Sequence, residues 1–573
     1  MIERTHKWRM ATVAVLIMGI LAGLGVRLAF LHLGPHQHWE DRVVRMRHTE
    51  RTIPAERGRI TDRRGQTLAM DLAMKDVWVD PQVIQEEGHG DFIATHLARI
   101  LQLDPAVVQS RINREGRRFE YIKRHVHNDT AEQVARMTFR GVHFDEVMTR
   151  HYAQGSLMCH VVGFSNLEGV GSAGVEQNLN MYLRGIPGLR LSERDGRRAE
   201  LYSRRHLDIA PRRGGDVQLT LDQSLQYIME DALDRGLEEF GGKAAWAIMM
   251  KVDTGEILAM ASRPHFDLNE YRTTTLEERR NRAISYNYEP GSTFKVAVIA
   301  AAFNEGLITP DNIIDCENGM WYYRGRPLRD YRPNGRLSVA DVLQKSSNIG
   351  AAKIALMMTE AQLESYMRDF GVGRRSGIDL PGEEPGILAP RSQWSAISVT
   401  RLAMGHEVAV TALQLLNSVN AIANNGYLMQ PYVVKRVTDS DGRVIRQGEP
   451  RVISRPIRED TARLMAQLMA RVTEEGGTGR AARMEGYRVA GKTGTAQKPI
   501  PGGYSDRLNI ASFVGFLPAD NPQISMIVVV DEPLPLRTGG AVAAPIFRNI
   551  AMEAVRYLDI PATEGIDEHV ARR

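Results

Sequence analysis

An uncharged apolar run near the N-terminus places the strongest constraint on how this chain can fold. The run covers residues 10–26 and, after Arg27, continues over residues 28–31. A helix needs about 20 predominantly apolar residues to cross the hydrocarbon core of a bilayer. Residues 10–31 are therefore predicted to form one transmembrane anchor, and the long remainder must fold in water.

Charged residues around this run predict its orientation. Arg4, Lys7 and Arg9 precede it, which favours a cytoplasmic N-terminal segment, residues 1–9, under the positive-inside rule. Arginines also follow the run, at positions 27, 42, 45 and 47, and weaken that asymmetry. A cleaved signal peptide is the alternative, but the segment is long for one and no small-x-small site follows closely. We expect an uncleaved single-pass anchor in the cytoplasmic (inner) membrane, with the body on the extracytoplasmic, periplasmic side.

Composition excludes several functional classes. The chain has 573 residues, of which 43% are hydrophobic and 25% charged, so a multidomain globular body is expected rather than a disordered or polytopic one. The formal net charge of +4 is small for this length, which argues against nucleic acid as a partner. Two cysteines, Cys159 and Cys316, provide neither a disulfide framework nor a zinc site. We expect no metal and no cofactor.

Two regions that differ in composition and in hydrophobic pattern follow the anchor. Residues 40–213 are arginine-rich and contain short strand-like segments, such as Phe119 to His125, with no long apolar helix before about residue 169. This region predicts an elongated, β-rich pedestal. Residues 216–560 show an α/β (α+β) pattern, and residues 561–573 are predicted to be a C-terminal tail.

The second region predicts one sheet assembled from both of its ends. The expected elements are a strand over 217–221, a helix over 223–240, a hairpin over 245–252 and 256–262, strands over 487–497, 509–516 and 524–531, and a closing helix over 544–557. Strands that precede and follow a helical block can pair only after that block has folded.

The first candidate for chemistry is a serine one helical turn before a lysine. Pro290 and Gly291 precede a helical pattern from Ser292 to Asn304, so Ser292 and Lys295 share one helix face. A serine hydroxyl needs a neighbouring base, and a lysine desolvated among apolar groups can act as that base. Taken alone, the pattern more often marks a capping serine and a surface lysine than a catalytic pair.

Two further motifs follow in order. Ser346-Ser347-Asn348 lies between two helical stretches, 339–344 and 349–358, and can direct a hydroxyl and an amide into a cleft. Lys492-Thr493-Gly494-Thr495 lies on a predicted strand, where Lys492 and Gly494 face oppositely to Thr493 and Thr495. Gly494 would leave room for a substrate backbone alongside the strand.

Ser-x-x-Lys, Ser-x-Asn and Lys-Thr-Gly, in this order and at these spacings, are the signature set of penicillin-binding proteins and serine β-lactamases. The chain also resembles the class B penicillin-binding proteins over nearly its whole length after the anchor. The resemblance is carried by the stalk motifs Arg57-Gly58-Arg59-Ile60-Thr61-Asp62 and Gly174-Val175-Glu176 and by Gly214-Gly215-Asp216-Val217. Glu289-Pro290-Gly291-Ser292 and Val530-Asp531-Glu532-Pro533 resemble the division (FtsI-like) type.

This resemblance implies a peptidoglycan D,D-transpeptidase with a penicillin-binding, serine β-lactamase-like domain. Ser292 would attack the carbonyl between two terminal D-alanines, Lys295 would take its proton, and the backbone N–H groups of Ser292 and Thr495 would hold the oxyanion. Ser347 would relay the proton to the departing D-alanine, and Asn348 would hold Lys295 and the substrate amide. Lys492, Thr493 and Thr495, on the strand with Gly494, would receive the terminal carboxylate.

Two positions depart from the family pattern. Ala153 stands after Arg150-His151-Tyr152 where the stalk motif usually has Pro, and Gly405-His406-Glu407-Val408 replaces a more common Gly-Tyr-Gly-Ile. Because of these two differences, the sequence does not predict the local geometry of the stalk or of a loop near the cleft.

Several alternatives remain at this stage. Within enzymes these are an elongation-type transpeptidase, a D,D-carboxypeptidase and a β-lactam-hydrolysing enzyme; from another class they are a division scaffold or a β-lactam sensor. The expected ligands are peptidoglycan stem peptides and β-lactams, and the resemblance implies a membrane-embedded FtsW-type glycosyltransferase and other division proteins as partners.

Overall fold

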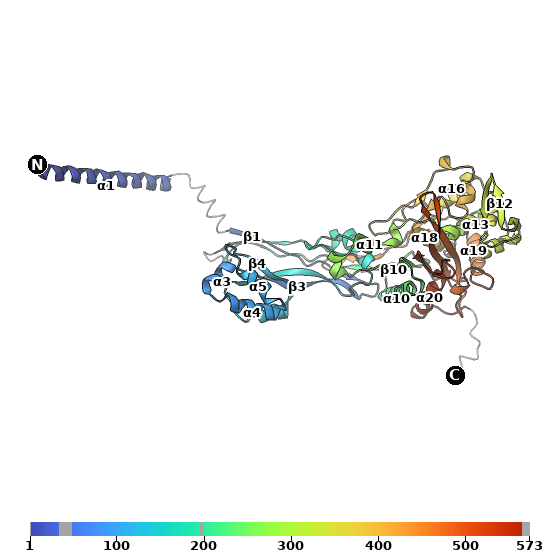
Figure 1. Ribbon diagram of the computed structural model, residues 1–573, viewed down its shortest axis with the longest axis horizontal. Coiled ribbons are helices and arrows are strands. Elements are labelled where there is room, and N and C mark those ends of the chain that lie inside the picture. Colours follow the sequence, from blue (N-terminus) through green and yellow to red (C-terminus); the bar gives the residue numbers. More distant parts are fainter. Residues whose placement is uncertain (1, 34–47, 195–199, 564–573) are drawn as a thin grey trace, which may run out of the picture. The chain divides into compact units, whose positions relative to one another are not determined.

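The structure, a computed structural model, describes residues 2–33, 48–194 and 200–563 (Figure 1). The chain divides into two compact units, Met1–Ala55 with Ile186–Arg212, and Glu56–Gly185 with Arg213–Arg573. The pedestal start predicted near residue 40 and most of the tail predicted at 561–573 lie outside the described residues.

The first unit contains the apolar run and a small sheet. Helix α1 covers Ile2–Leu33, and its segment His6–Leu33 is long and apolar enough to cross a membrane. It encloses the run predicted as the anchor. Strands β1 (His48–Ile53), β6 (Gly188–Arg194) and β7 (Glu200–Ile209) form an antiparallel sheet in the order β1-β6-β7.

The second unit begins with a seven-stranded sheet that combines residues far apart in the chain. Its strands are β2 (Ile60–Thr61), β3 (Thr67–Val79), β4 (Glu120–His127), β5 (Val142–Tyr152), β8 (Val217–Leu219), β18 (Val434–Thr438) and β19 (Val444–Gln447). Their order is β19-β18-β8-β2-β3-β4, with β5 paired to β3. The strand predicted at the entry to the second region, β8, therefore joins strands of both predicted regions.

Four helices pack against β3 and β4, although sequence analysis expected only short strands there. They are α3 (Pro81–Glu87), α4 (Gly90–Leu101), α5 (Pro105–Ile112) and α6 (Asn128–Ala135). Asp80 and Asp104 cap α3 and α5 in front of a proline, a common helix start. The 12-residue helix α4 buries one apolar face into a core shared with β3 and β4. The helical spacing of its apolar residues is the sequence feature that could have predicted this helix.

Two of the quoted motifs meet backbone to backbone. A Cβ on Gly58 would lie 1.8 Å from the carbonyl oxygen of Gly215, so no other residue fits at that position. The backbone N–H of Arg59 donates to Asp216 Oδ1 at 2.6 Å. The contact ties the first stalk motif to the segment that leads into β8.

Arg57, the residue before Gly58, belongs to a buried ionic cluster. Glu176, with 0% exposure, accepts from Arg57 Nε and from Arg150 Nε, each at 2.6 Å. Arg150 also pairs with Asp71 at 3.1 Å, and the Asp71 carboxylate accepts from the backbone N–H of Arg57 at 2.8 Å. All four groups are held by charge-assisted hydrogen bonds, which offset the cost of their burial.

The site-bearing part is built on a five-stranded sheet in the order β10-β9-β23-β22-β21. Its strands are β9 (Ala244–Lys251), β10 (Ile257–Arg263), β21 (Ala490–Ile500), β22 (Gly503–Leu517) and β23 (Ile524–Asp531). The prediction of one sheet from both ends of this region is confirmed, as are the helix α10 (Gln223–Phe240) and the closing helix α20 (Ala543–Tyr557).

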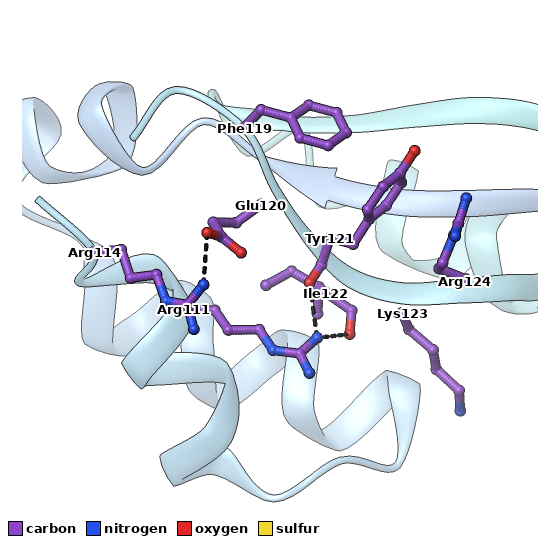
Figure 2. A pocket seen from close by; sticks show the side chains of 8 residues that line it. All are labelled: Arg111, Arg114, Phe119, Glu120, Tyr121, Ile122, Lys123 and Arg124. Carbon is purple, nitrogen blue, oxygen red and sulfur yellow. Dashed lines mark hydrogen bonds and ion pairs between the residues drawn. The ribbon is translucent and has the colours of Figure 1, made fainter. Parts of the chain in front are cut away.

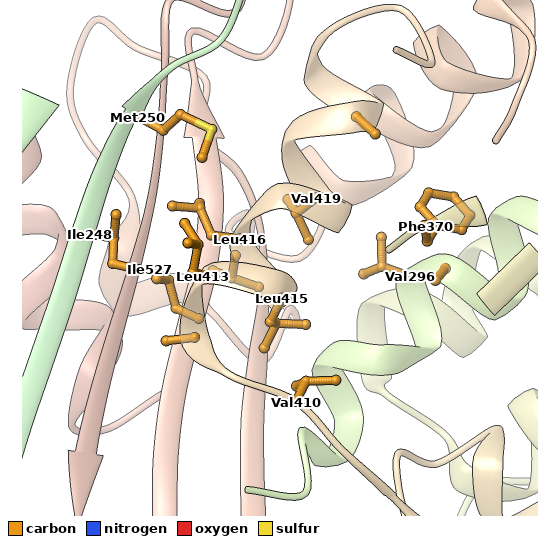
Figure 3. Close-up of a cluster of buried hydrophobic side chains, with 14 of the residues drawn as sticks. Ile248, Met250, Val296, Phe370, Val410, Leu413, Leu415, Leu416, Val419 and Ile527 are labelled. Atoms are coloured by element: carbon orange, nitrogen blue, oxygen red, sulfur yellow. The ribbon is translucent and has the colours of Figure 1, made fainter. Parts of the chain in front are cut away.

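Both faces of this sheet are buried. On β9, Ala245, Ala247 and Met249 belong to a core with α10 and α20, whereas Trp246, Ile248 and Met250 belong to the main core. Figure 3 shows the second face, where Ile248, Met250 and Ile527 point toward Leu413 and Leu416 of α18 (Ala412–Ala423). Beyond α18 lies Val296 of α13 (Lys295–Asn304), so α18 separates the sheet from the helix that follows Ser292.

The remaining helices and strands form the connections. They are α7 (Cys159–Val162), α8 (Gly174–Asn178), α9 (Asn180–Leu183), η1 (Leu268–Thr273), α11 (Leu276–Arg279), α12 (Arg282–Ser285), η2 (Gly291–Phe294), β11 (Ile313–Asp315), η3 (Glu317–Gly319), β12 (Met320–Tyr323), β13 (Arg326–Arg329), β14 (Arg336–Ser338), α14 (Val339–Lys345), α15 (Asn348–Ala355), α16 (Glu360–Asp369), β15 (Ile387–Leu388), η4 (Arg391–Gln393), α17 (Ser398–Leu402), β16 (Val408–Ala409), β17 (Leu428–Met429), β20 (Val452–Ser454), α19 (Glu459–Ala470) and η5 (Arg480–Ala482).

The ionic cluster yields a stability prediction. Arg57→Ala would leave the buried Glu176 carboxylate with one cation, and we expect a loss of about 3 to 5 kcal/mol in unfolding free energy. Arg140→Ala, which removes an exposed pair with Glu87, is the control and should cost about 1 kcal/mol or less. Urea unfolding followed by circular dichroism measures both. Equal losses in the two variants would contradict a structural role for the cluster.

Candidate active site

Three segments that are distant in the sequence converge at the candidate site. The first is the 3-10 turn η2 that leads into α13, the second is the junction between α14 and α15, and the third is the edge strand β21. All three predicted motifs lie on these segments.

Ser292 lies on a turn that the chain approaches through a glycine. Gly291 has φ +56°, and its backbone N–H donates to the carbonyl of Gly405 at 3.3 Å. A Cβ on Gly405 would lie 2.2 Å from Gly291 O. The loop Gly405-His406-Glu407, whose sequence differs from the family pattern, therefore packs directly on the turn that carries Ser292. His406 also contacts Glu289 at 2.8 Å.

The amino group of Lys295 is the centre of the site. The side chain has 0% exposure, and Nζ donates to Ser292 Oγ at 3.0 Å, to Asn348 Oδ1 at 2.6 Å and to the Ser346 carbonyl at 2.7 Å. Burial lowers the pKa of Lys295 to about 7, against a smaller opposing effect of the Asp330 charge. Within the described residues Lys295 forms no salt bridge, and the Asp330 charge only partly offsets the effect of burial on its pKa.

The two adjacent serines of the second motif lie in different environments. Ser346, not Ser347, faces the lysines: its hydroxyl lies 3.3 Å from Lys295 Nζ and 2.8 Å from Lys492 Nζ. Ser347 is the N-cap of α15, where its hydroxyl accepts from the N–H of Gly350 at 2.9 Å and donates to Asp330 at 2.7 Å. Ser346 has φ +61°, and this left-handed turn rotates it toward the cleft.

The third motif contributes a second buried amino group. Lys492 has 0% exposure, and Nζ donates to the Ser346 hydroxyl and to the Thr493 carbonyl at 3.1 Å. Burial, together with the charge of Lys295, lowers the pKa of Lys492 well below its usual value. The two amino groups thus share one hydroxyl and each disfavours the charge of the other.

Successive residues of β21 around Lys492 point to opposite sides of the strand. Thr493 Oγ1 pairs with Thr478 Oγ1 at 2.8 Å, and Thr495, which is exposed, accepts from the N–H of Gly539 at 3.1 Å. Gly494 faces the interior instead: a Cβ there would lie 2.3 Å from Ser512 Oγ and 2.9 Å from Thr293 Cγ2. Its lack of a side chain lets the Ser292 turn pack on β21.

Asp330 is the functional candidate that sequence analysis missed. It follows β13, and its carboxylate accepts from the backbone N–H of Asn348 at 2.6 Å and of Ile349 at 3.0 Å, as well as from Ser347 Oγ. These bonds fix the start of α15 and hence the position of Asn348. No motif marks Asp330, because it reaches the site only through the fold of a loop.

Comparison with known proteins agrees with this geometry. A family model described as the penicillin binding protein transpeptidase domain matches residues 245–552, and one described as the penicillin-binding protein dimerisation domain matches residues 52–219. The chain belongs to the penicillin-binding protein family. The three motifs around Ser292, Asn348 and Lys492 lie within the first matched segment, and the stalk motifs lie within the second.

Curated relatives extend over nearly the whole of this penicillin-binding protein. It is 32% identical to a probable peptidoglycan D,D-transpeptidase PenA of Neisseria meningitidis, over 98% of this chain and 95% of that protein. It is 31% identical to the peptidoglycan D,D-transpeptidase FtsI of Escherichia coli, over 96% and 92%.

Among solved structures, the chain resembles penicillin binding protein 3 of Mycobacterium tuberculosis in complex with aztreonam. The TM-score is 0.71 at 26% identity, over 90% of this chain and 98% of that one. A peptidoglycan synthetase of Bifidobacterium adolescentis gives a TM-score of 0.72 at 25% identity, over 91% and 98%. The α/β penicillin-binding fold expected from the motifs is confirmed.

The site predicts a pH-dependent reaction. As the expected base, Lys295 would have to be neutral to accept a proton, so acylation by a penicillin should rise with pH and level off above about pH 7. Asp330→Asn keeps the hydrogen-bond acceptor but removes the charge that raises the pKa of Lys295, so the inflection should move to lower pH. Stopped-flow acylation rates measured across pH test this.

Asp341→Asn is the matched control, because this α14 carboxylate pairs with Arg471 at 2.9 Å rather than with the lysines. Its profile should match that of the unaltered protein. An unchanged inflection in Asp330→Asn would show that Asp330 acts only on the shape of the turn.

Proposed function

We propose that the chain is a peptidoglycan D,D-transpeptidase in which Ser292 forms an acyl-enzyme with stem peptides. The observation that carries the proposal is the buried amino group of Lys295, with a pKa of about 7, at 3.0 Å from Ser292 Oγ. A neutral amine at that distance can take the hydroxyl proton directly. The family membership and the names of the relatives support the same reaction.

The first half-reaction is acyl transfer to Ser292. Lys295 takes the proton as the Ser292 oxygen attacks the carbonyl between two terminal D-alanines, and the N–H groups of Ser292 and Thr495 hold the resulting oxyanion. Each such donor is typically worth about 2.7 to 4 kcal/mol. The C–N bond then breaks, and the departing D-alanine amine leaves with a proton.

We assign the relay of that proton to Ser346 in place of Ser347. The Ser346 hydroxyl contacts both lysine amino groups, whereas the Ser347 hydroxyl is engaged by Asp330 and Gly350. Asn348 orients Lys295 through its side-chain oxygen, while its amide nitrogen donates to the Arg329 carbonyl at 2.8 Å. Lys492, Thr493 and Thr495 receive the terminal carboxylate, which stabilises a charged Lys492 when it binds.

The second half-reaction distinguishes a transpeptidase from a D,D-carboxypeptidase. In the former, the amine of a second stem peptide attacks the acyl carbon, a new amide forms and Ser292 is released; in the latter, water is the acceptor. Relatives at about the same identity in Escherichia coli and Neisseria meningitidis are named as transpeptidases, which supports the former.

We also propose a septal role at the cytoplasmic membrane. The likeness to the peptidoglycan D,D-transpeptidase FtsI supports this septal role. Residues 1–9 would be cytoplasmic, residues 10–31 of α1 would be the anchor and the catalytic domain would be extracytoplasmic. An FtsW-type glycosyltransferase and other division proteins are the proposed partners.

A labelling experiment tests the enzymatic proposal. Fluorescent penicillin should label the purified chain covalently, and Ser292→Ala should abolish the label. Incubation with donor stem peptide and an amine acceptor should yield a cross-linked product together with free D-alanine. Release of D-alanine without any cross-linked product would replace the transpeptidase by a carboxypeptidase. Reversible binding of penicillin without an adduct would favour a sensor or scaffold.

Two glycine substitutions test the choice between the adjacent serines. Ser346→Gly removes the hydroxyl at a left-handed position that glycine tolerates, and acylation should fall roughly 100-fold or more. Ser347→Gly replaces an N-cap, a change that typically costs only a few tenths of a kcal/mol, and should leave acylation within about threefold. A larger loss of rate in Ser347→Gly than in Ser346→Gly would reverse the assignment.

A further inference from the structure

A cavity of about 590 Å³ lies in the second unit, away from the candidate active site, and contains none of its residues. It is lined by two residues of α5 and its C-terminal flank and by a consecutive run that ends within β4, namely Arg111, Arg114, Phe119, Glu120, Tyr121, Ile122, Lys123 and Arg124 (Figure 2). This volume is in the range of ligand-binding pockets.

The cavity borders the open edge of a sheet. The strand order ends at β4, which pairs with β3 on one side, and within the described residues no strand pairs with its other side. Five successive residues of β4, Glu120 to Arg124, line the cavity, together with Phe119 immediately before the strand. An open edge presents unpaired backbone donors and acceptors to another chain.

Arg111 partly takes the place of a missing neighbour strand. Its Nη1 donates to the carbonyl oxygens of Tyr121 at 2.7 Å and Ile122 at 2.8 Å (Figure 2). The backbone N–H of an added strand can make the same kind of bond. The Arg111 guanidinium would then be free to bind a carboxylate with its fork of donors.

The segment around this edge is strongly cationic. Residues 111–124 contain six Arg or Lys side chains and two Glu side chains, so their formal charge equals the +4 of the whole chain. Arg114 pairs with Glu120, and Arg124 with Asp76. Within the part of the chain that the structure describes, Arg111 and Lys123 donate to backbone carbonyls and form no salt bridge. Two cations therefore remain uncompensated beside the edge.

An exposed aromatic ring lies at the start of this edge. Phe119 is 44% exposed and stacks edge-on against Tyr121, with ring centroids 4.7 Å apart. An apolar side chain of an added strand could cover Phe119, as alternate side chains do in a sheet.

We infer that β4 is a docking edge for an extended acidic peptide segment of another exported protein. The peptide adds as a strand to the free edge of β4, and its carboxylates bind Arg111, Lys123 and Arg114. Backbone pairing gives affinity and the charges select the partner, the usual division of labour in β-strand addition. An anionic glycan would use the charges alone, so the unpaired strand edge favours a peptide. This site is independent of the function proposed for Ser292.

The test uses the full chain in detergent and a fluorescent seven-residue peptide that alternates Glu with Val. Fluorescence anisotropy should show saturable binding to the unaltered protein, and Arg111→Gln and Lys123→Gln should each weaken it roughly tenfold or more. Arg99→Gln, an exposed arginine on α4 outside the cavity, is the matched control and should leave affinity unchanged. Penicillin labelling of each variant verifies that the protein is folded.

A second peptide separates strand addition from charge attraction. Methylation of alternate backbone nitrogens keeps every carboxylate but removes the donors that pair with β4, so binding should be lost. Equal binding of the methylated peptide, or displacement of the first peptide by soluble anionic peptidoglycan fragments, would overturn the proposal in favour of an anionic polymer. Lack of binding by either peptide, or equal loss in Arg99→Gln, would also overturn it.

Discussion

The burial of two lysine amino groups around one hydroxyl is the constraint on which the rest of the structure depends. Lys295 and Lys492 each have 0% exposure and both contact Ser346 Oγ. An isolated buried ammonium is costly, and two adjacent ones disfavour each other further. Desolvation therefore lowers both pKa values and keeps an amine available as a base next to Ser292 near neutral pH. The packing of the surrounding elements must offset the free-energy cost of burying these two amino groups.

Well-packed elements surround the lysines on three sides and hold them in their buried positions. Helix α18 lies between the five-stranded sheet and α13 and is buried along its length (Figure 3), which fixes the helix that begins at Lys295. Gly494 allows Thr293 to pack on β21, and Asp330 holds the first N–H groups of α15. These contacts hold Lys295 in place, so a small shift in any of them would change the distance between Lys295 Nζ and Ser292 Oγ.

Much of the site was accessible from the sequence because its chemistry is local. Ser292 and Lys295 lie one turn apart on a strongly apolar helix, and the strands and helices at both ends of the region have clear periodicity. The choice between Ser346 and Ser347 also depends on local features. In the Ser-x-Asn pattern the serine two residues before Asn348 is Ser346, and the left-handed φ of Ser346 and the N-cap role of Ser347 agree with that choice. Helix α4 was missed although its amphipathic spacing is present in the sequence.

The sequence by itself determined the apolar segment 10–31, the order of the three motifs and the α/β character of the region after residue 216, because hydrophobic periodicity and turn chemistry act over a few residues. Only the tertiary structure decided that Asp330 supports Asn348, that Gly494 serves the packing of Thr293, and that β4 ends its sheet with an open cationic edge. These features depend on contacts between segments far apart in the chain. Such contacts leave no pattern in either segment, since burial and charge compensation exist only once the two surfaces have met.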